Sequence, residues 1–559
     1  MAEVDYIIPE EEYPVVPNVS PVMILKGTDY EIGYQYMQQL YEIFGPWALR
    51  RLKHEFTDQE LLALKAYHEQ IEKYTPEFVE QFKGRVAGSS ACGIPLTYEE
   101  VLLENCRSLL SRFEMYPGEE SDYSKESILP RGCSGMAAWG SATKDGKLHC
   151  AASADHPLFH HVITLIIPDE GNSYICPNVI PPSPGVHPAM NNKGLSMTHH
   201  AQPVPGDSKP GYGVPVMLME QHTLRFADNV EEALELQRSY PLEVTTGGMW
   251  VDVHGGSLAL ECRNPLCARK AGDFGEEDFI YATNTELSLE LERFMAAGVG
   301  HSLGWPVFYV EHGGWNQDDL NSIRRNLYLW NMLHNYHGEI DLEFVKMMWR
   351  LPSKAPEYPT LEEAEVKLNE TLGKGWDSHI GNLAICFMAL LEPDDGNNGK
   401  YYVCDGSPAK QAEPLTQGFF FFPVDRLLTF TEIQLADSPV AVTMAAKKRA
   451  QYDLYDANKE LRKLGYADVA YAPLSKIFDD AAIESQKGDY YLGLAQASQG
   501  NDQVNLFAKA ARCFYRCQAY AKHVFESLVP QPACPSDLGL KEWMGDWGEW
   551  EIVDSCPEE

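Results

Sequence analysis

The sequence predicts an α+β fold in which antiparallel β-sheet is covered by helices. Residues 29–112 and the chain beyond about 443 show helical patterns, whereas residues 133–445 contain short strand-like runs close to Gly, Pro, Asn and Asp. These strands and helices lack the regular alternation that a doubly wound parallel sheet requires. We therefore expect a helical segment over 1–132, a mixed core over 133–445 and a helical extension over 446–559.

The prediction of the first helical segment is based on periodicity and composition. Apolar residues recur with the helical period over 30–37 and 58–67, among strong helix formers. A turn-rich acidic stretch, 117–122, follows shortly before Cys133. An exposed polar loop of this kind would let two chain ends separate if the chain were cut after it.

The central segment is expected to alternate irregularly between strands and helices. Strands are predicted over 136–139, 162–167, 195–198, 249–253, 279–282, 383–388 and 401–404. Helices are predicted over 229–238, 318–335 and 342–349. The aromatic run 419–422, which precedes a proline, is most simply a buried strand.

The C-terminal segment is expected to be helical and to serve packing. Six apolar residues in it are spaced by three and four positions, which places them on one helix face. They are Phe507, Ala510, Ala511, Phe514, Cys517 and Ala521.

Composition limits the partners and the compartment. Lys and Arg number 45 against 81 Asp and Glu, a net charge of −36, which would repel nucleic acid and anionic membranes. The 13 cysteines include no C-x-x-C pair, so neither a disulfide framework nor a zinc ribbon is indicated. The N-terminus has no secretory signal pattern, and no apolar run reaches the ~18 residues of a membrane span. We expect a cytoplasmic protein with no nucleic-acid or membrane partner.

The pair Gly132-Cys133 carries the main chemical prediction. It opens an apolar strand that runs into a Lys-Asp-Gly turn at 144–146. A glycine before a scissile bond allows backbone strain without a side-chain clash. Cleavage before Cys133 would create an α-amine, with a reference pKa near ~8, that could accept the proton of the thiol. The alternative is a buried structural thiol, the commoner state of a cysteine.

Separated stretches of the chain resemble one enzyme family. The strongest match is the segment that begins at Cys133. Residues 24–35 are similar to the signature of the family's pro-region, although shortly after them Met37 stands where a second glycine is usual. Weaker matches at 190–195, 283–284 and 322–325 follow in the expected order. The chain in this way resembles the acyl-coenzyme A:6-aminopenicillanic acid acyltransferase family, peptidase family C45 of the N-terminal nucleophile (Ntn) hydrolases. The resemblance spans about residues 20 to 410 and leaves the C-terminal helices uncovered.

The resemblance implies a fold and a reaction. The fold is a four-layer αββα sandwich, here with an additional C-terminal helical region. Autoproteolysis between Gly132 and Cys133 would give two chains that stay associated as a heterodimer. Cys133 would then cleave or transfer the acyl group of a small N-acylated substrate through an acyl-enzyme, with water, an amine or acyl-coenzyme A as the other reactant. No metal or other cofactor is implied.

The resemblance also assigns roles to residues around the nucleophile. Asp155, 22 residues after Cys133, would hold the new α-amine by a charge-assisted hydrogen bond. Asn284 would donate to a developing oxyanion. Arg325, with Arg324 as its competitor, would favour the thiolate and orient the aspartate. The alternative for Asp155 is a solvent-exposed aspartate in a turn, and that for Asn284 is an asparagine that merely ends a strand. For either arginine the alternative is a position on a solvent-exposed helix face.

The chain departs from the family just before the aspartate. Residues 151–154 are Ala-Ala-Ser-Ala where relatives often carry Arg or Gln and then Asn, and His156 stands where an aromatic residue is common. We expect histidines to rebuild the polar network of the site. The candidates for substrate binding are His156, His199, His200 and Asn192.

Two other classes of protein remain open. The first is a zinc hydrolase, in which His156 and His160 would share a helix face, although Pro157 and the β-branched run 162–164 favour a turn into a strand and no H-E-x-x-H occurs. The second is an uncleaved binding or scaffold protein with an Ntn fold, suggested by the altered stretch 151–154.

Overall fold

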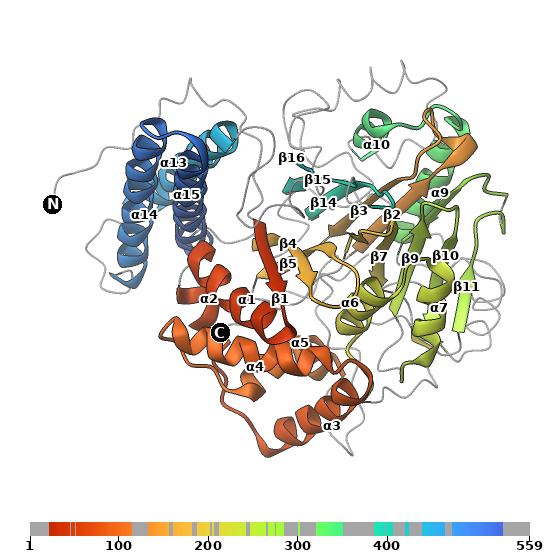
Figure 1. Ribbon diagram of the computed structural model, residues 1–559, viewed down its shortest axis with the longest axis horizontal. Coiled ribbons are helices and arrows are strands. Elements are labelled where there is room, and N and C mark those ends of the chain that lie inside the picture. The colour runs from red at the N-terminus through yellow and green to blue at the C-terminus, as the bar shows by residue number, and fades with distance from the viewer. Residues whose placement is uncertain are drawn as a thin grey trace.

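The structure is a computed structural model with two large β-sheets and helices on both of them (Figure 1). It describes residues 22–44, 46–50, 52–113, 132–155, 160–180, 187–201, 204–205, 212–241, 246–263, 266–273, 275–283, 300–301, 320–349, 385–396, 399–405, 420–423, 439–463 and 472–528. The predicted α+β class is confirmed.

The larger sheet has eight strands. In spatial order they are β1 (Val22–Gly27), β4 (His160–Pro168), β5 (Tyr174–Ile180), β6 (Ala189–Asn191), β7 (Leu195–Ala201), β9 (Thr246–Asp252), β10 (Ser257–Arg263) and β11 (Leu266–Arg269). The pair β1 and β4 is parallel, whereas all the other pairs of this sheet are antiparallel. The expectation of a purely antiparallel sheet was therefore wrong. The N-terminal segment, which was predicted to be helical, contributes the edge strand β1, and β1 runs parallel to β4.

The smaller sheet has six strands and contains the proposed nucleophile. In order they are β12 (Phe279–Ala282), β2 (Gly132–Ala138), β3 (His149–Asp155), β14 (Ile385–Glu392), β15 (Lys400–Asp405) and β16 (Phe420–Pro423). All its pairs are antiparallel. A further small pair joins β8 (Val204–Pro205) to β13 (Gly300–His301).

The two sheets face each other, with β2 packed against β7. Successive side chains of a strand point to opposite faces of the sheet, so the two faces of the smaller sheet contact different parts of the protein. Ala137 and Cys150 belong to the same hydrophobic core as the larger sheet. Met136, Ala138 and Ala151 belong to a second core formed with α9 (Leu320–Asn335) and α10 (Leu342–Met348). The smaller sheet thus lies between the larger sheet and these two helices.

Helices also cover the larger sheet. Contacts join α1 to β1 and β4, α6 to β6, and α7 to β9 and β10. The helices of this side are α1 (Asp29–Phe44), α2 (Pro46–Arg50), α3 (Asp58–Tyr74), α4 (Glu77–Ala91), α5 (Tyr98–Phe113), α6 (Val216–Phe226) and α7 (Val230–Ser239). A short 3-10 helix, η3 (Gly140–Ala142), lies in the turn between β2 and β3.

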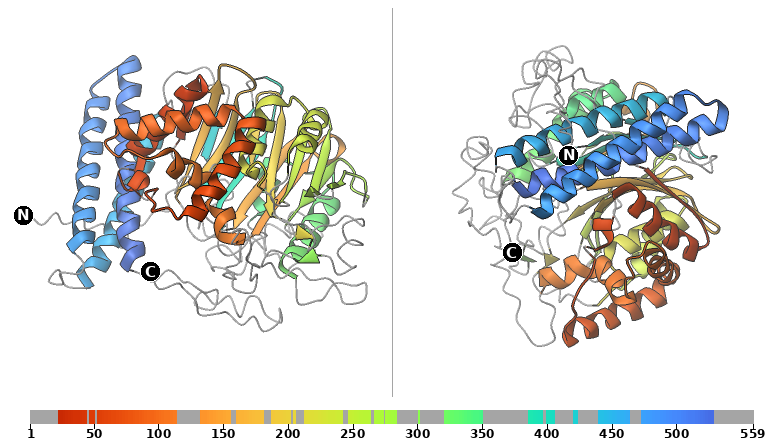
Figure 2. Two further views of the ribbon diagram at one scale, coloured as in Figure 1. Left: turned by 90° about the horizontal axis from the view of Figure 1, so that it is seen from below. Right: turned by 90° about the vertical axis from the view of Figure 1, so that its left-hand side faces the viewer.

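The C-terminal helices form a bundle that packs beside the first helix through α15 (Figure 2). They are α13 (Pro439–Lys463), α14 (Ala472–Gln496) and α15 (Gly500–Leu528). The six residues that the sequence placed on one face of the last helix are all buried, at 3% exposure or less, which confirms their packing role.

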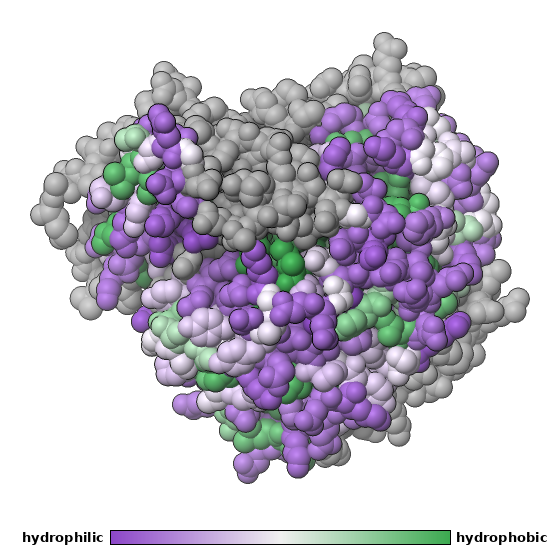
Figure 3. Space-filling model, viewed as in Figure 1, coloured by the Kyte–Doolittle hydropathy of each residue, from purple (hydrophilic) through white to green (hydrophobic). Residues whose placement is uncertain are grey.

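The described surface is largely hydrophilic on the face shown in Figure 3, with small hydrophobic areas between the hydrophilic residues. None of the helices in the described part of the chain combines the length and apolar character needed to cross a membrane.

Helices α1 and α4 approach each other backbone to backbone at glycines. A Cβ atom added at Gly84 would lie 2.0 Å from the carbonyl oxygen of Tyr30, and one at Gly33 would lie 1.9 Å from that of Gln81. Because backbone atoms cannot yield as a flexible side chain can, any residue larger than glycine must push the two helices apart.

We therefore expect Gly84→Ala to lower the apparent free energy of unfolding by roughly 2–3 kcal/mol, through overpacking. Urea unfolding would measure the loss as a lower midpoint. The matched control is Gly493→Ala, a helical glycine with nothing within 4 Å of the added Cβ. Helix propensity should make that variant more stable by up to about 1 kcal/mol. Equal midpoints for the two variants would contradict the close contact.

Candidate active site

Cys133 lies at the start of an interior strand, second in β2, and is 5% exposed. In the register of β2 and β3, Gly132 is opposite Asp155 and Cys133 is opposite Ala154. Directly opposed residues have Cβ atoms roughly 4.5–5.5 Å apart. The fold therefore brings the backbone of Asp155 beside the Gly132–Cys133 bond, although the Asp155 side chain lies outside the described part of the structure.

Arg325 approaches Cys133 from helix α9. Its Nη1 donates to the carbonyl oxygen of Cys133 at 2.6 Å and to Ser134 Oγ at 2.7 Å. The side chain is buried, at 2% exposure. Hydrogen bonds from a charged donor are roughly twice as strong as neutral ones, so this contact holds the backbone of Cys133 firmly. Arg324 precedes it on α9, and its side chain lies outside the described residues.

His200 of β7 lies against the other face of β2. A Cβ added at Gly135, which shares a strand face with Cys133, would lie 2.9 Å from both His200 Nε2 and Thr198 Oγ1. Thr198 Oγ1 is 2.7 Å from His200 Nε2, within hydrogen-bond distance. Burial lowers the pKa of His200 well below its usual value, and nearby basic side chains act in the same direction, whereas the backbone of Cys133 opposes them. His200 is therefore a neutral imidazole next to strand β2.

The structure separates His199 and Asn192 from this space. His199 faces away from His200 because neighbouring strand residues point to opposite faces, and its Nδ1 lies 3.0 Å from Glu220 Oε1 on α6. Asn192 precedes Leu195, the first residue of β7, and five strand residues, roughly 16 Å, separate Leu195 from His200. The structure therefore brings neither residue to Cys133, and their role in substrate binding stays a prediction.

Two further predicted residues, Asn284 and His156, lie outside the described residues. Strand β12 ends at Ala282 opposite Gly135, two residues before Asn284. His160, the second residue of the zinc hypothesis, begins strand β4 and not a helix. Among the described residues, no group of three or more His, Cys, Asp or Glu side chains is arranged to hold a metal ion.

His187 is a buried residue near the site that sequence reasoning missed. Its ring lies edge-on to that of His200, with centroids 5.4 Å apart. In the sequence His187 stands in a stretch rich in proline, 181–188, that has no strand or helix period. No local pattern marks it, because its position depends on contacts between the two sheets.

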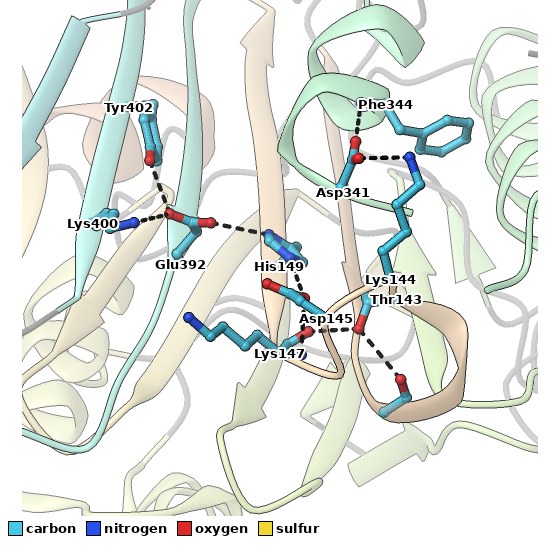
Figure 4. Close-up of polar contacts among 11 residues, drawn as sticks. Thr143, Lys144, Asp145, Lys147, His149, Asp341, Phe344, Glu392, Lys400 and Tyr402 are labelled. Atoms are coloured by element: carbon cyan, nitrogen blue, oxygen red, sulfur yellow. Dashed lines mark hydrogen bonds and ion pairs between the residues drawn. The ribbon is translucent and has the colours of Figure 1, made fainter. Parts of the chain in front are cut away.

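A separate polar network holds the far end of the β2–β3 hairpin (Figure 4). His149 Nε2 lies 3.1 Å from Asp145 Oδ1, and His149 Nδ1 lies 3.6 Å from Glu392 Oε1. Lys144 Nζ pairs with Asp341 Oδ2 at 2.8 Å. His149 is opposite Ala138, six residues from Gly132 and thus roughly 20 Å away along the strand. This network stabilises the hairpin without reaching Cys133.

Comparisons with known proteins assign no activity to the chain. No protein-family model matches the sequence. An uncharacterised protein of Archaeoglobus fulgidus is 26% identical over 236 residues, which is 39% of this chain and 39% of the length of that protein. Two crystal structures of variants of the conjugated bile acid hydrolase from Clostridium perfringens give TM-scores of 0.30 and 0.29 at 16% sequence identity. These matches cover 52% of this chain and 96% and 97% of those chains.

Proposed function

We propose that the protein is a cysteine Ntn-type hydrolase or acyltransferase in which Cys133 is the nucleophile. The observation that carries the proposal is the setting of Cys133 at the start of an interior strand. Asp155 pairs opposite the preceding Gly132, and Arg325 donates to the carbonyl oxygen of Cys133. The two facing sheets, with helices on their outer sides, support the four-layer αββα sandwich that the resemblance implies.

The proposed chemistry begins with cleavage of the Gly132–Cys133 bond. The new α-amine of Cys133 takes the thiol proton, and the thiolate attacks the carbonyl carbon of an N-acyl substrate. The C–N bond of the substrate breaks, the amine leaves with the proton from the α-ammonium, and a thioester forms. Water then releases the acid in hydrolysis, whereas an amine takes the acyl group in transfer.

The neighbouring residues have distinct proposed roles in that reaction. Asp155 would hold the α-ammonium, and Asn284 would donate to the oxyanion. Arg325 would keep the Cys133 backbone in place through its two hydrogen bonds. The substrate class is a small N-acylated molecule, as the resemblance implies.

The N-terminal segment would remain bound after cleavage, which supports a heterodimer of the two chains. Strand β1 pairs with β4 along its whole length, from Val22 opposite Ile163 to Gly27 opposite Pro168. In addition, Arg225 Nη1 lies 2.5 Å from Asp29 Oδ1, in a largely buried ion pair between α6 and α1. These contacts do not depend on the 132–133 peptide bond.

Denaturing electrophoresis tests the proposal. Cleavage before Cys133 of the 62.8 kDa chain is expected to give two bands of about 15 and 48 kDa, with Cys133 as the first residue of the larger. Intact-mass measurement after incubation with a panel of N-acyl amides should then show one acyl group added to the larger chain. A single uncleaved chain that gains no acyl group would instead favour the binding or scaffold protein.

A further inference from the structure

His187 connects the two sheets beside the nucleophile. Its Nε2 lies 2.7 Å from the carbonyl oxygen of Ser153 on β3, in the smaller sheet. Its Nδ1 lies 2.8 Å from the backbone nitrogen of His199 on β7, in the larger sheet. Ser153 adjoins Ala154, the residue opposite Cys133. One imidazole ring therefore spans from β7 to the strand that pairs with the nucleophile.

The two hydrogen bonds determine the protonation state of His187. The backbone N–H of His199 can only donate, so Nδ1 must accept and carry no proton. The carbonyl oxygen of Ser153 can only accept, so Nε2 must carry the proton and donate. Burial, opposed by the Ser153 hydrogen bond, lowers the pKa of His187 to about 3. The ring is therefore neutral, and both of its nitrogen atoms are used by the backbone.

The backbone of both sheets is arranged to receive this bridge. The pairing of β3 with β14 shifts register between Ile385 and Phe387, opposite Asp155 and Ala154, so the ladder is interrupted next to Ser153. On the other side of His187, the buried hydroxyl of Tyr401 donates to the carbonyl oxygen of Pro188 at 2.8 Å. The segment at 187–188 is thus held to the smaller sheet by two hydrogen bonds.

We propose that His187 is a positioning residue, which sets the spacing of the sheets at Cys133 and thereby the alignment of Cys133, Asp155 and His200. The role in turnover rests on the proposed function, whereas the bridge itself does not. A shift of about 1 Å in a catalytic group can lower a rate by roughly 100-fold. No role in proton transfer is assigned to His187, because neither of its nitrogen atoms is available.

The test compares two substitutions at His187. Leucine fills similar space but makes neither hydrogen bond, so His187→Leu should lower kcat by roughly 30- to 100-fold and leave KM within about threefold. Glutamine has an amide donor and acceptor, so His187→Gln should retain kcat within about threefold. The matched control is His149→Leu, which removes another buried histidine from the far end of β3 and should leave kcat unchanged.

Alkylation of Cys133 by iodoacetamide, followed by peptide mass spectrometry, gives a readout that needs no substrate. In folded His187→Leu protein, the thiol should react at least about fivefold faster, because the sheets are no longer held together over a cysteine that is 5% exposed. His187→Gln and His149→Leu should react as the wild type does. A folded His187→Leu protein with unchanged alkylation would overturn the proposal. If alkylation responds as expected but the wild type forms no acyl-enzyme, the bridge stands and the hydrolase function fails.

Discussion

Alanine in place of Cys133 is expected to leave the chain uncleaved and to lower amide hydrolysis by at least about 10⁴-fold, as for loss of the nucleophile in other hydrolases. The side chain is buried on a strand opposite Ala154, so a truncation there should leave the fold intact. Electrophoresis would show one band in place of two, and product assays would show the loss of turnover. The variant should also fail to gain an acyl group in intact-mass measurements.

Cys150 provides the control for this prediction. It lies on the neighbouring strand β3, is buried to a similar degree, and burial raises the pKa of its thiol. Cys150→Ala should therefore be cleaved and active as the wild type is. Full hydrolysis by Cys133→Ala, or loss of hydrolysis in folded Cys150→Ala, would contradict the assignment of the nucleophile.

Loss of the Arg325 side chain is expected to have the second-largest effect. Arg325→Met removes a buried cation that donates to the Cys133 carbonyl oxygen and to Ser134 Oγ, and leaves both oxygen atoms without that donor. We expect kcat/KM to fall by roughly 10²–10³-fold, because a shift of about 1 Å in a reacting group can by itself cost roughly 100-fold and loss of a donor in a buried active site costs about 10²–10³-fold. Arg325→Lys should recover part of the activity, because lysine restores the charge but not the planar fork of donors.

The neighbouring arginine serves as the comparison for Arg325. Arg324→Met makes the same chemical change one position earlier on α9. Arg324 is the residue that the sequence offered as the alternative to Arg325. We expect this variant to keep its activity within about threefold. Steady-state kinetics and a thermal unfolding curve would be recorded for both variants. A larger loss in Arg324→Met than in Arg325→Met would reverse the assignment.

Many of the secondary-structure elements could be predicted from short stretches of sequence. The strand expected over 279–282 is β12, and the helix expected over 318–335 is α9. Strand β1 was missed, since six residues that precede a helix show no alternation that distinguishes an edge strand. Strand β6, with three residues, is too short to show any period.

The candidate site was only partly accessible from sequence. The glycine before Cys133 and the resemblance around it singled out Cys133 as the candidate nucleophile, and a motif match singled out Arg325. The pair His199 and His200 was selected together, yet alternation along β7 sends one ring toward Glu220 and the other toward Gly135. Which face of strand β7 is turned toward Cys133 depends on how the two sheets stack.

The pattern of residues along the chain therefore determined the α+β class, the helices on either side of the strand-rich core and the cysteine at the head of a strand, because each depends on neighbours in sequence. Tertiary structure decided which side chains meet at that cysteine. Arg325 is 192 residues away from Cys133, and His187 is 34 residues away from Ser153. Such contacts arise only when separate elements pack, because the orientation of each side chain is set by the helix or sheet that carries it.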